Sequence, residues 1–175
     1  MSVAFIAVGA NIEPEKNIRA ALTMLQQQTQ VIGSSTFYRT KPIGRRDQPA
    51  YINGVWQIET ELPPTEVKTR LLLPIEQQLG RVRTGDKFAP RTIDLDLILY
   101  DDLVLDDSDI KLPHPDIARP FVYFPVVELL SGIACESAGG LPERMMRLLP
   151  QKIPTGEPGQ PLAELTQELR DWIRG

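Results

Sequence analysis

The chain has 175 residues, of which 42% are hydrophobic and 24% are charged, and its formal net charge is −4. This length and composition are typical of one globular domain with its own core, so we expect residues 1–175 to form a single domain. The acidic balance argues against a general nucleic-acid-binding protein, and no apolar run approaches the roughly 20 residues of a membrane-spanning helix.

The N-terminal part of the chain has the pattern of alternating strands and helices. Residues 2–9 are apolar without a preceding basic segment, which indicates a first strand rather than a signal peptide. Residues 14–30 predict a helix, since apolar side chains recur on one helical face at Ile18, Ala21, Leu22 and Leu25. Residues 31–40 and 51–62 predict two further strands, separated by a loop at 41–50 that contains proline and glycine.

A second helix is predicted over residues 63–80, with Thr65 as N-cap and Gly80 just past its end. Pro74 lies inside this helix and should kink it, because proline removes a main-chain hydrogen bond. A basic loop follows at 81–91, then a strand at 92–100 and a short hairpin through 101–105.

The order β-α-β-β-α-β predicts an α+β sandwich of ferredoxin-like type, with antiparallel strands, helices on one side and an additional edge strand or hairpin. Residues 154–161 have the composition of a linker. Residues 162–174 predict a C-terminal helix with an apolar stripe formed by Leu162, Leu165, Leu169, Trp172 and Ile173. We expect this stripe to dock on its own domain rather than on a second copy, and hence a monomer.

Two aspartates, Asp94 and Asp96, interrupt the apolar run of the strand at 92–100. Strand geometry separates their Cα atoms by about 6.5 Å on one face. One face of the predicted strand then carries Asp94, Asp96, Ile98 and Tyr100. The opposite face carries Ile93, Leu95, Leu97 and Leu99. The pair can be a solvent-exposed acidic face, or it can bind one or two hard cations, for which Mg²⁺ is the natural candidate.

Basic residues favour the second interpretation of the aspartate pair. Arg91 directly precedes the pair, and the loop before it contains Arg81, Arg83 and Lys87. Carboxylates that hold Mg²⁺ beside guanidinium groups that grip phosphate oxygens would form a phosphoryl-transfer site. A structural cluster of ion pairs is the alternative that spacing alone leaves open.

Three other features have both a structural and a functional interpretation. The single histidine, His114, lies between two prolines and is either structural or a rigid ligand contact. Tyr51 and Asn53 would share a strand face and could stack on and hydrogen-bond a flat heterocycle, although the pair taken alone favours a core tyrosine with a turn asparagine. The single cysteine, Cys135, cannot form an internal disulfide, which together with the lack of a leader predicts the cytoplasm. One cysteine and one histidine also cannot complete a tetrahedral zinc site.

Several segments together resemble one enzyme family, the 6-hydroxymethyl-7,8-dihydropterin pyrophosphokinases of folate biosynthesis. They are FYRTKPIG, DQPAYINGV, GRVR, APRTIDLDLILY and LPHPDIARPFV, and the resemblance covers about residues 2–130. It implies a ferredoxin-like sandwich that transfers pyrophosphate from ATP to the hydroxymethyl group of a reduced pterin, with release of AMP. The substrates are then ATP and 6-hydroxymethyl-7,8-dihydropterin, and the cofactor is two Mg²⁺ ions.

The resemblance also implies a role for individual residues. Asp94 and Asp96 match the metal ligands, and Arg81, Arg91 and Asp96 match the catalytic groups. ATP-binding positions fall on Glu76, Arg83, Lys87, His114 and Arg119. Pterin-binding positions fall on Thr40, Ile43, Gly44, Tyr51, Asn53 and Phe121. The chain departs from the family pattern at Lys41, Phe88 and Pro115, of which Phe88 keeps an apolar group in the mobile loop.

Two further functions remain as alternatives to the pterin enzyme. One is a diphosphotransferase of the same chemistry that acts on another alcohol. The other is a ferredoxin-like module that binds RNA, which would present a basic sheet with exposed aromatic residues. The two acids of the strand at 92–100 argue against such a sheet.

Overall fold

A computed structural model describes residues 1–44, 47–86, 88–133 and 140–175. Its main sheet is antiparallel and has the strand order β5-β1-β4-β3-β8, with β2 also paired to β4. The strands are β1 (Ser2–Ala10), β2 (Gln30–Ser34), β3 (Tyr38–Thr40), β4 (Tyr51–Thr60), β5 (Asp94–Tyr100) and β8 (Gln160–Pro161). The connectivity of this sheet confirms the ferredoxin-like α+β sandwich.

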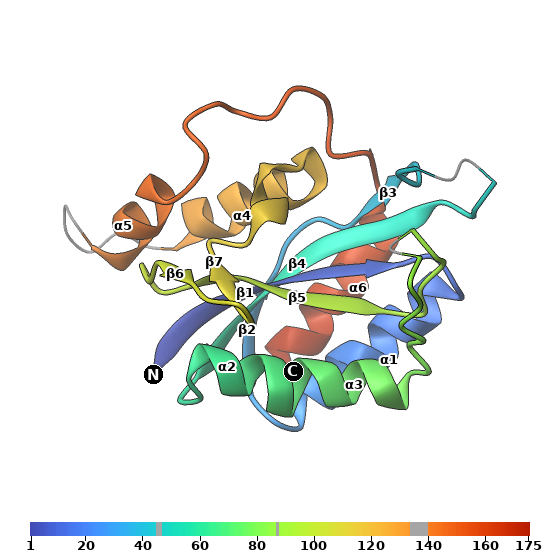
Figure 1. Cartoon of the computed structure of the whole chain (residues 1–175), viewed down its shortest axis with the longest axis horizontal. Coiled ribbons are helices and arrows are strands. Elements are labelled where there is room, and N and C mark those ends of the chain that lie inside the picture. The colour runs from blue at the N-terminus through green and yellow to red at the C-terminus, as the bar shows by residue number, and fades with distance from the viewer. Residues whose placement is uncertain (45–46, 87, 134–139) are drawn as a thin grey trace.

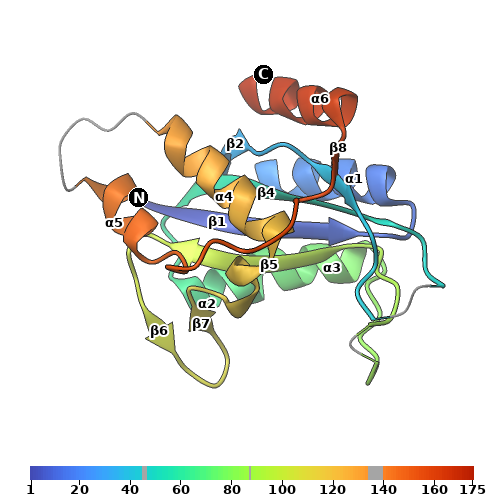
Figure 2. The same cartoon turned by 90° about the horizontal axis from the view of Figure 1, so that it is seen from above.

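Helices cover both faces of the sheet (Figures 1 and 2). One face packs against α1 (Pro14–Gln26), α3 (Leu73–Gln78) and α6 (Ala163–Arg174), and the other against α4 (Pro120–Gly132) and α5 (Leu141–Arg147). The expectation of helices on one side was therefore wrong. The reason lies in the central strands, which are apolar on both faces: Phe5 is buried beneath α4 while Ile6 is buried on the α1 side.

The smaller elements also depart in detail from expectation. The predicted hairpin exists, but it is formed by β6 (Leu105–Asp106) and β7 (Lys111–Leu112) rather than by residues 101–105. The edge strand is β8, which comes from the end of the predicted linker. Among the described residues, no helix is both long and apolar enough to cross a bilayer.

The second predicted helix begins at Pro64 in α2 (Pro64–Glu66), so Thr65 is inside the helix and is not its N-cap. Pro74 does not break the helix, which continues past it (Figure 1). A π-helical turn, η1 (Val67–Leu72), directly precedes α3, and the Leu73 N–H donates to the Lys68 carbonyl five residues earlier. This wider turn accommodates the proline. Gly80 follows the helix with φ +74°, as expected of a residue past the end.

The strand that contains the aspartate pair has a β-bulge. Phe5 of β1 pairs with Leu99, but Ile6 pairs with Leu97, so Ile98 is an extra residue. Beyond the bulge the alternation reverses: Leu99 packs on the α4 side and Tyr100 on the α1 side. The predicted faces are thus correct from Asp94 to Ile98 and wrong for the last two residues.

Two other predictions need correction. The helix at 14–30 ends at Gln26, because the chain turns at Thr29 to enter β2. The strand at 31–40 is broken between Ser34 and Tyr38 into β2 and β3, and both halves pair with β4.

The C-terminal helix does dock on its own chain, as expected, but Trp172 lies outside the packed stripe and is 42% exposed.

Candidate functional site

A cavity of about 380 Å³ opens on the α4 face of the sheet. Strands β1, β4 and β5 form its floor. Its walls include the beginning of α4 and residues of the two loops that precede β4 and β5, namely Lys41, Ile43, Phe88 and Arg91. Eleven of the residues singled out from the sequence line it: Thr40, Lys41, Ile43, Tyr51, Asn53, Phe88, Arg91, Asp94, Asp96, Arg119 and Phe121. The fold therefore brings together groups that are far apart in the chain, from Thr40 to Phe121.

One cross-strand row connects the two halves of this cavity. Gly9 of β1 is opposite Asp94 of β5 on one side and Asn53 of β4 on the other. Directly opposed residues point to the same face of a sheet, so the carboxylate and the amide lie on one surface, roughly 10 Å apart between their Cα atoms. A Cβ atom on Gly9 would lie 2.7 Å from Asn53 Oδ1, so only glycine leaves room for this amide.

Asp94 is held by two arginines. It forms an ion pair with Arg91, and the Arg81 guanidinium lies 3.7 Å from its Oδ1 atom. The Arg81 side chain is 8% exposed, and its Nε atom has no hydrogen-bond partner among the described residues. A buried guanidinium N–H without an acceptor is costly, and a phosphate oxygen is a suitable acceptor.

Asp96 lies in a more negative environment. Burial, together with the charges of Asp94, Glu76 and Asp116, raises the pKa of Asp96 to about 7. No ion pair of Asp96 is found within the described part of the chain. Its surroundings thus disfavour the charged form of Asp96, and a divalent cation bound there would favour it.

The carboxylates fit Mg²⁺ bound jointly with a substrate. Among the described residues, no three His, Cys, Asp or Glu side chains are arranged to hold an ion by themselves. Mg²⁺ is commonly bound through one or two carboxylates together with waters and substrate phosphates. Asp94 and Asp96 would provide the two carboxylates of such a site.

Glu76 does not line the cavity but is buried behind it. Its Oε1 atom accepts a hydrogen bond from the Leu95 N–H at 2.8 Å, and its Oε2 atom accepts one from Arg83 at 2.6 Å. Burial raises the pKa of Glu76 above its ordinary value. Because Leu95 lies between the two aspartates on the edge strand β5, this carboxylate stabilises the strand segment that presents them.

Of the other residues assigned to ATP, Arg119 lines the cavity and His114 does not. His114 caps the 3₁₀ helix η2 (Pro115–Ala118), with its Nδ1 atom accepting a hydrogen bond from Asp116 N–H at 3.1 Å. Arg119 donates to Asp116 at 2.7 Å, and its guanidinium lies 5.9 Å from the centre of the Phe121 ring. Lys87 and Cys135 lie outside the described residues.

The residues assigned to pterin form the opposite end of the cavity. Asn53 Nδ2 donates a hydrogen bond to Thr40 Oγ1 at 2.6 Å, which orients the amide. Tyr51 and Phe121 contribute rings from β4 and α4, and burial raises the pKa of Tyr51. Gly44 has φ +87°, and a Cβ atom there would lie 2.9 Å from the Phe88 ring, so the two loops touch at this point.

Asn11 and Gln48 belong to this site but were missed in the sequence. Asn11 Oδ1 accepts a hydrogen bond from the Arg91 N–H at 2.7 Å, and Asn11 Nδ2 donates to Gln48 Oε1 at 3.1 Å. Gln48 in turn donates to the Phe88 carbonyl. These contacts connect Gln48, in the loop before β4, to Phe88 and Arg91, in the loop before β5.

Comparisons with known proteins agree with this geometry. Residues 5–131 match the family model described as 7,8-dihydro-6-hydroxymethylpterin-pyrophosphokinase (HPPK). The chain is similar to the 2-amino-4-hydroxy-6-hydroxymethyldihydropteridine pyrophosphokinase of Haemophilus influenzae, with 35% identity over 87% of this chain and 97% of the relative. It is also similar to the protein of that name from Pseudomonas aeruginosa, with 36% identity over 79% and 87% of the two chains.

A solved structure supports the fold. A crystal structure of HPPK-DHPS from Plasmodium falciparum aligns with a TM-score of 0.50 and 10% identity, covering 84% of this chain and 43% of that one. At this identity the likeness concerns the fold alone.

Proposed function

Because the chain belongs to the 7,8-dihydro-6-hydroxymethylpterin-pyrophosphokinase family, an enzyme family of folate biosynthesis, we propose that it transfers pyrophosphate from ATP to 6-hydroxymethyl-7,8-dihydropterin. One observation carries the proposal: Asp94, Gly9 and Asn53 form a single row in one cavity. A group that binds phosphate through a cation is thereby placed beside a group that can bind the edge of a heterocycle.

The pterin would lie between the rings of Tyr51 and Phe121, which line the cavity from β4 and α4. The Asn53 amide is fixed by Thr40 and has its Oδ1 atom next to Gly9, so it can accept a hydrogen bond from an amino group on the pterin edge. A site that pairs a ring stack with a fixed amide would discriminate a pterin from a simple alcohol.

The triphosphate would lie towards Asp94, Asp96, Arg91 and Arg81. Mg²⁺ bound by Asp94 and Asp96, as two ions in this proposal, would neutralise the phosphates and acidify the attacking hydroxyl. The pterin oxygen attacks the β-phosphorus, the bond between the β-phosphorus and the α,β-bridging oxygen breaks, and AMP leaves with the electron pair while the hydroxyl proton is released. Arg81 and Arg91 would stabilise the charge that develops on the leaving group.

The two loops would exclude water during this step. Ile43 and Phe88 contribute apolar side chains at the mouth of the cavity, and both are exposed in this structure. Closure of the loops over both substrates would bury these side chains and strengthen the electrostatic contacts inside. We further propose that residues 1–175 act as one domain, as a monomer in the cytoplasm.

The test incubates the protein with ATP, Mg²⁺ and 6-hydroxymethyl-7,8-dihydropterin and measures the formation of AMP by chromatography of the nucleotides. We expect AMP and the pterin diphosphate in equal amounts, and neither without the pterin. Replacing the pterin by simple alcohols provides the matched control, since turnover with them would indicate a diphosphotransferase of different specificity. Absence of AMP with the pterin at saturating concentrations would refute the proposal.

A further inference from the structure

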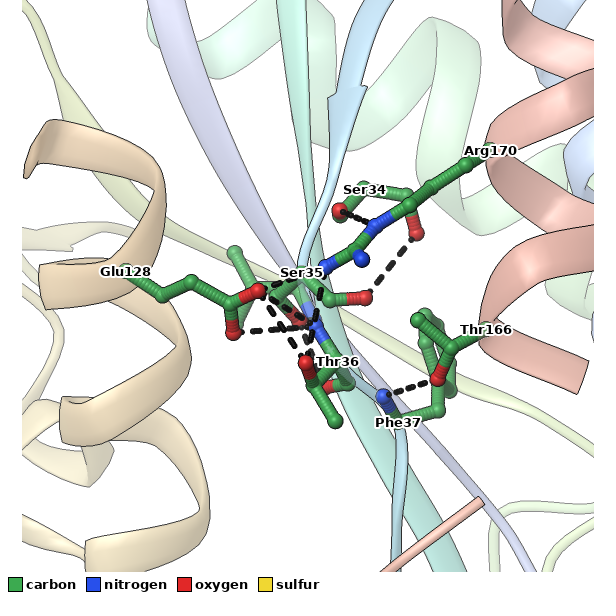
Figure 3. Close-up of polar contacts among 8 residues, drawn as sticks. Ser34, Ser35, Thr36, Phe37, Glu128, Thr166 and Arg170 are labelled. Atoms are coloured by element: carbon green, nitrogen blue, oxygen red, sulfur yellow. Dashed lines mark hydrogen bonds and ion pairs between the residues drawn. The ribbon is translucent and has the colours of Figure 1, made fainter. Parts of the chain in front are cut away.

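The break between β2 and β3 is held by side chains from two helices on opposite faces of the sheet (Figure 3). Glu128 of α4 accepts hydrogen bonds from Thr36 N–H at 3.0 Å and Thr36 Oγ1 at 3.1 Å. Arg170 of α6 donates to Glu128 at 2.6 Å and to the Ser34 carbonyl at 3.1 Å. The main chain leaves the regular ladder here because these side chains satisfy its polar groups.

Phe37 is the last residue of the break. Its main-chain N–H and carbonyl both form hydrogen bonds with residues at the start of α6. Its N–H donates to Thr166 Oγ1 at 2.9 Å, and its carbonyl accepts from the Leu162 N–H at 2.8 Å. Its ring lies on Gly54 of β4, where an added Cβ atom would be 2.5 Å from the ring. Phe37 therefore connects the C-terminal helix to the strand that bears Asn53.

The strand β8 extends this contact along β3. Gln160 and Pro161 pair with Arg39 and Tyr38. Gly159, with φ +126°, precedes them, and a Cβ atom there would lie 2.5 Å from the Arg39 carbonyl oxygen and 3.0 Å from Thr40 Cγ2. The C-terminal segment thus packs directly against Thr40.

Thr40 is the residue whose hydroxyl orients the Asn53 amide in the cavity. Its strand, β3, pairs with β4 over only three residues, Tyr38–Thr40. A pairing this short contributes little stability by itself, so the position of Thr40 depends on the contacts made by residues 159–166.

We propose that residues 159–166 are a positioning element for the pterin end of the site, with Thr166 and Gly159 as positioning residues that act through Phe37 and Thr40. The inference rests on the proposed function for the identity of the ligand. It assigns a role to a segment that lies beyond residues 5–131, the part that matches the family model.

The first test replaces Thr166 by valine, which has the same shape but cannot accept the hydrogen bond from Phe37. We expect the Kd for the pterin to rise about threefold to tenfold, with an unchanged Kd for Mg·ATP, because the ATP-binding residues lie on other elements. Thr166→Ser keeps the hydroxyl and should restore pterin binding. Glu168→Gln is the matched control, since the hydrogen bonds of the Glu168 side chain in the described part of the chain go to Arg19 of α1.

The second test uses two glycines that both have a positive φ. Gly159→Ala introduces the contact with Arg39 and Thr40, whereas Gly156→Ala, at φ +106°, meets only a Pro120 atom at 3.9 Å. Both variants place an alanine at a positive φ, which destabilises each of them. A larger loss of pterin affinity in Gly159→Ala than in Gly156→Ala therefore isolates the effect on β3. Amide hydrogen exchange at residues 38–40, relative to β1, should accelerate in Gly159→Ala and Thr166→Val alone.

Equal losses of pterin and ATP affinity, or unchanged exchange at residues 38–40 in Thr166→Val and Gly159→Ala, would overturn the inference while leaving the proposed function intact. A wild-type chain that neither binds the pterin nor releases AMP would instead overturn the proposed function, and with it the ligand assigned to this positioning element.

Discussion

Asn11 and Arg91, 80 positions apart in the chain, share two hydrogen bonds at the edge of the site, and Ile12 adds a third bond to Arg91. The Asn11 side-chain oxygen accepts from the Arg91 N–H at 2.7 Å, and the Arg91 carbonyl accepts from the N–H groups of Asn11 and Ile12 at 3.0 and 3.1 Å. The turn after β1 thereby fixes Arg91, three residues before the first residue of β5, and through Gln48 it also holds the opposite loop.

Asn11→Ala should lower kcat about tenfold, because Arg91 and both loops lose their common anchor. We also expect a loss of about 1–3 kcal/mol in the free energy of unfolding, since the buried Arg91 N–H is left without an acceptor. Steady-state kinetics and urea unfolding measure the two effects. Asn17→Ala is the control, because the Asn17 amide donates to the Ile12 carbonyl in the same turn and, among the described residues, forms no hydrogen bond with Gln48, Phe88 or Arg91. A similar fall in kcat there would contradict the explanation.

Asp96→Ala should lower turnover at least about 100-fold while the fold and pterin affinity stay largely intact. The physical reason is that the apolar α1 face of β5 is unchanged, whereas the carboxylate proposed to hold Mg²⁺ is lost. Circular dichroism, pterin titration and the AMP assay test the three parts. Asp107→Ala removes an exposed carboxylate of the adjacent hairpin segment and should leave all three unchanged. An unfolded Asp96→Ala chain would favour a structural role for the aspartate pair.

Arg91→Ala should reduce kcat more than it weakens ATP binding, because its proposed interaction is strongest in the transition state. Single-turnover rates and the Kd for Mg·ATP separate the two quantities. Arg70→Ala, which removes an exposed guanidinium paired with Glu66 on α2, is the matched control. If rate and affinity fell by the same factor, Arg91 would act by positioning ATP alone.

His114 predicts a pH dependence of stability. Burial lowers the pKa of His114 below its ordinary value of 6.5. The unfolded chain therefore takes up a proton that the folded chain resists, so the contribution of His114 to the free energy of unfolding should fall as pH drops below about 6.5. The raised pKa of Asp96 acts in the opposite direction in this range, so the effect of His114 is measured as a difference between variant and wild type. One group limits this slope to about 1.4 kcal/mol per pH unit.

The variant His114→Asn tests this dependence, because asparagine can accept the hydrogen bond from Asp116 N–H without titrating. Urea unfolding at pH 7.5 and 5.5 should show that the free energy of unfolding of the wild type falls relative to that of the variant at the lower pH. His114 is the only histidine, so no other imidazole contributes in this range. An equal decrease in both proteins would show that His114 does not titrate in the way expected.

Local pattern predicted a large part of this molecule. The strands and helices up to residue 100 follow from hydrophobic periodicity, and the common orientation of Asp94 and Asp96 follows from their spacing, because both properties depend on near neighbours in the chain. The roles assigned to individual site residues came from the resemblance of longer motifs, since the spacing of the aspartates alone fits an ion-pair cluster equally well.

The tertiary structure decided what near neighbours do not encode. The break at Ser35–Phe37 lies inside a sequence with strand propensity, and it forms because Glu128, Thr166 and Arg170, over 90 residues away, satisfy its main-chain groups. The bulge at Ile98 and the helices on both faces depend likewise on packing between distant elements. The sequence by itself determined which elements and which chemical groups are present; long-range hydrogen bonds and burial determined where the chain departs from regularity and which of those groups meet in one cavity.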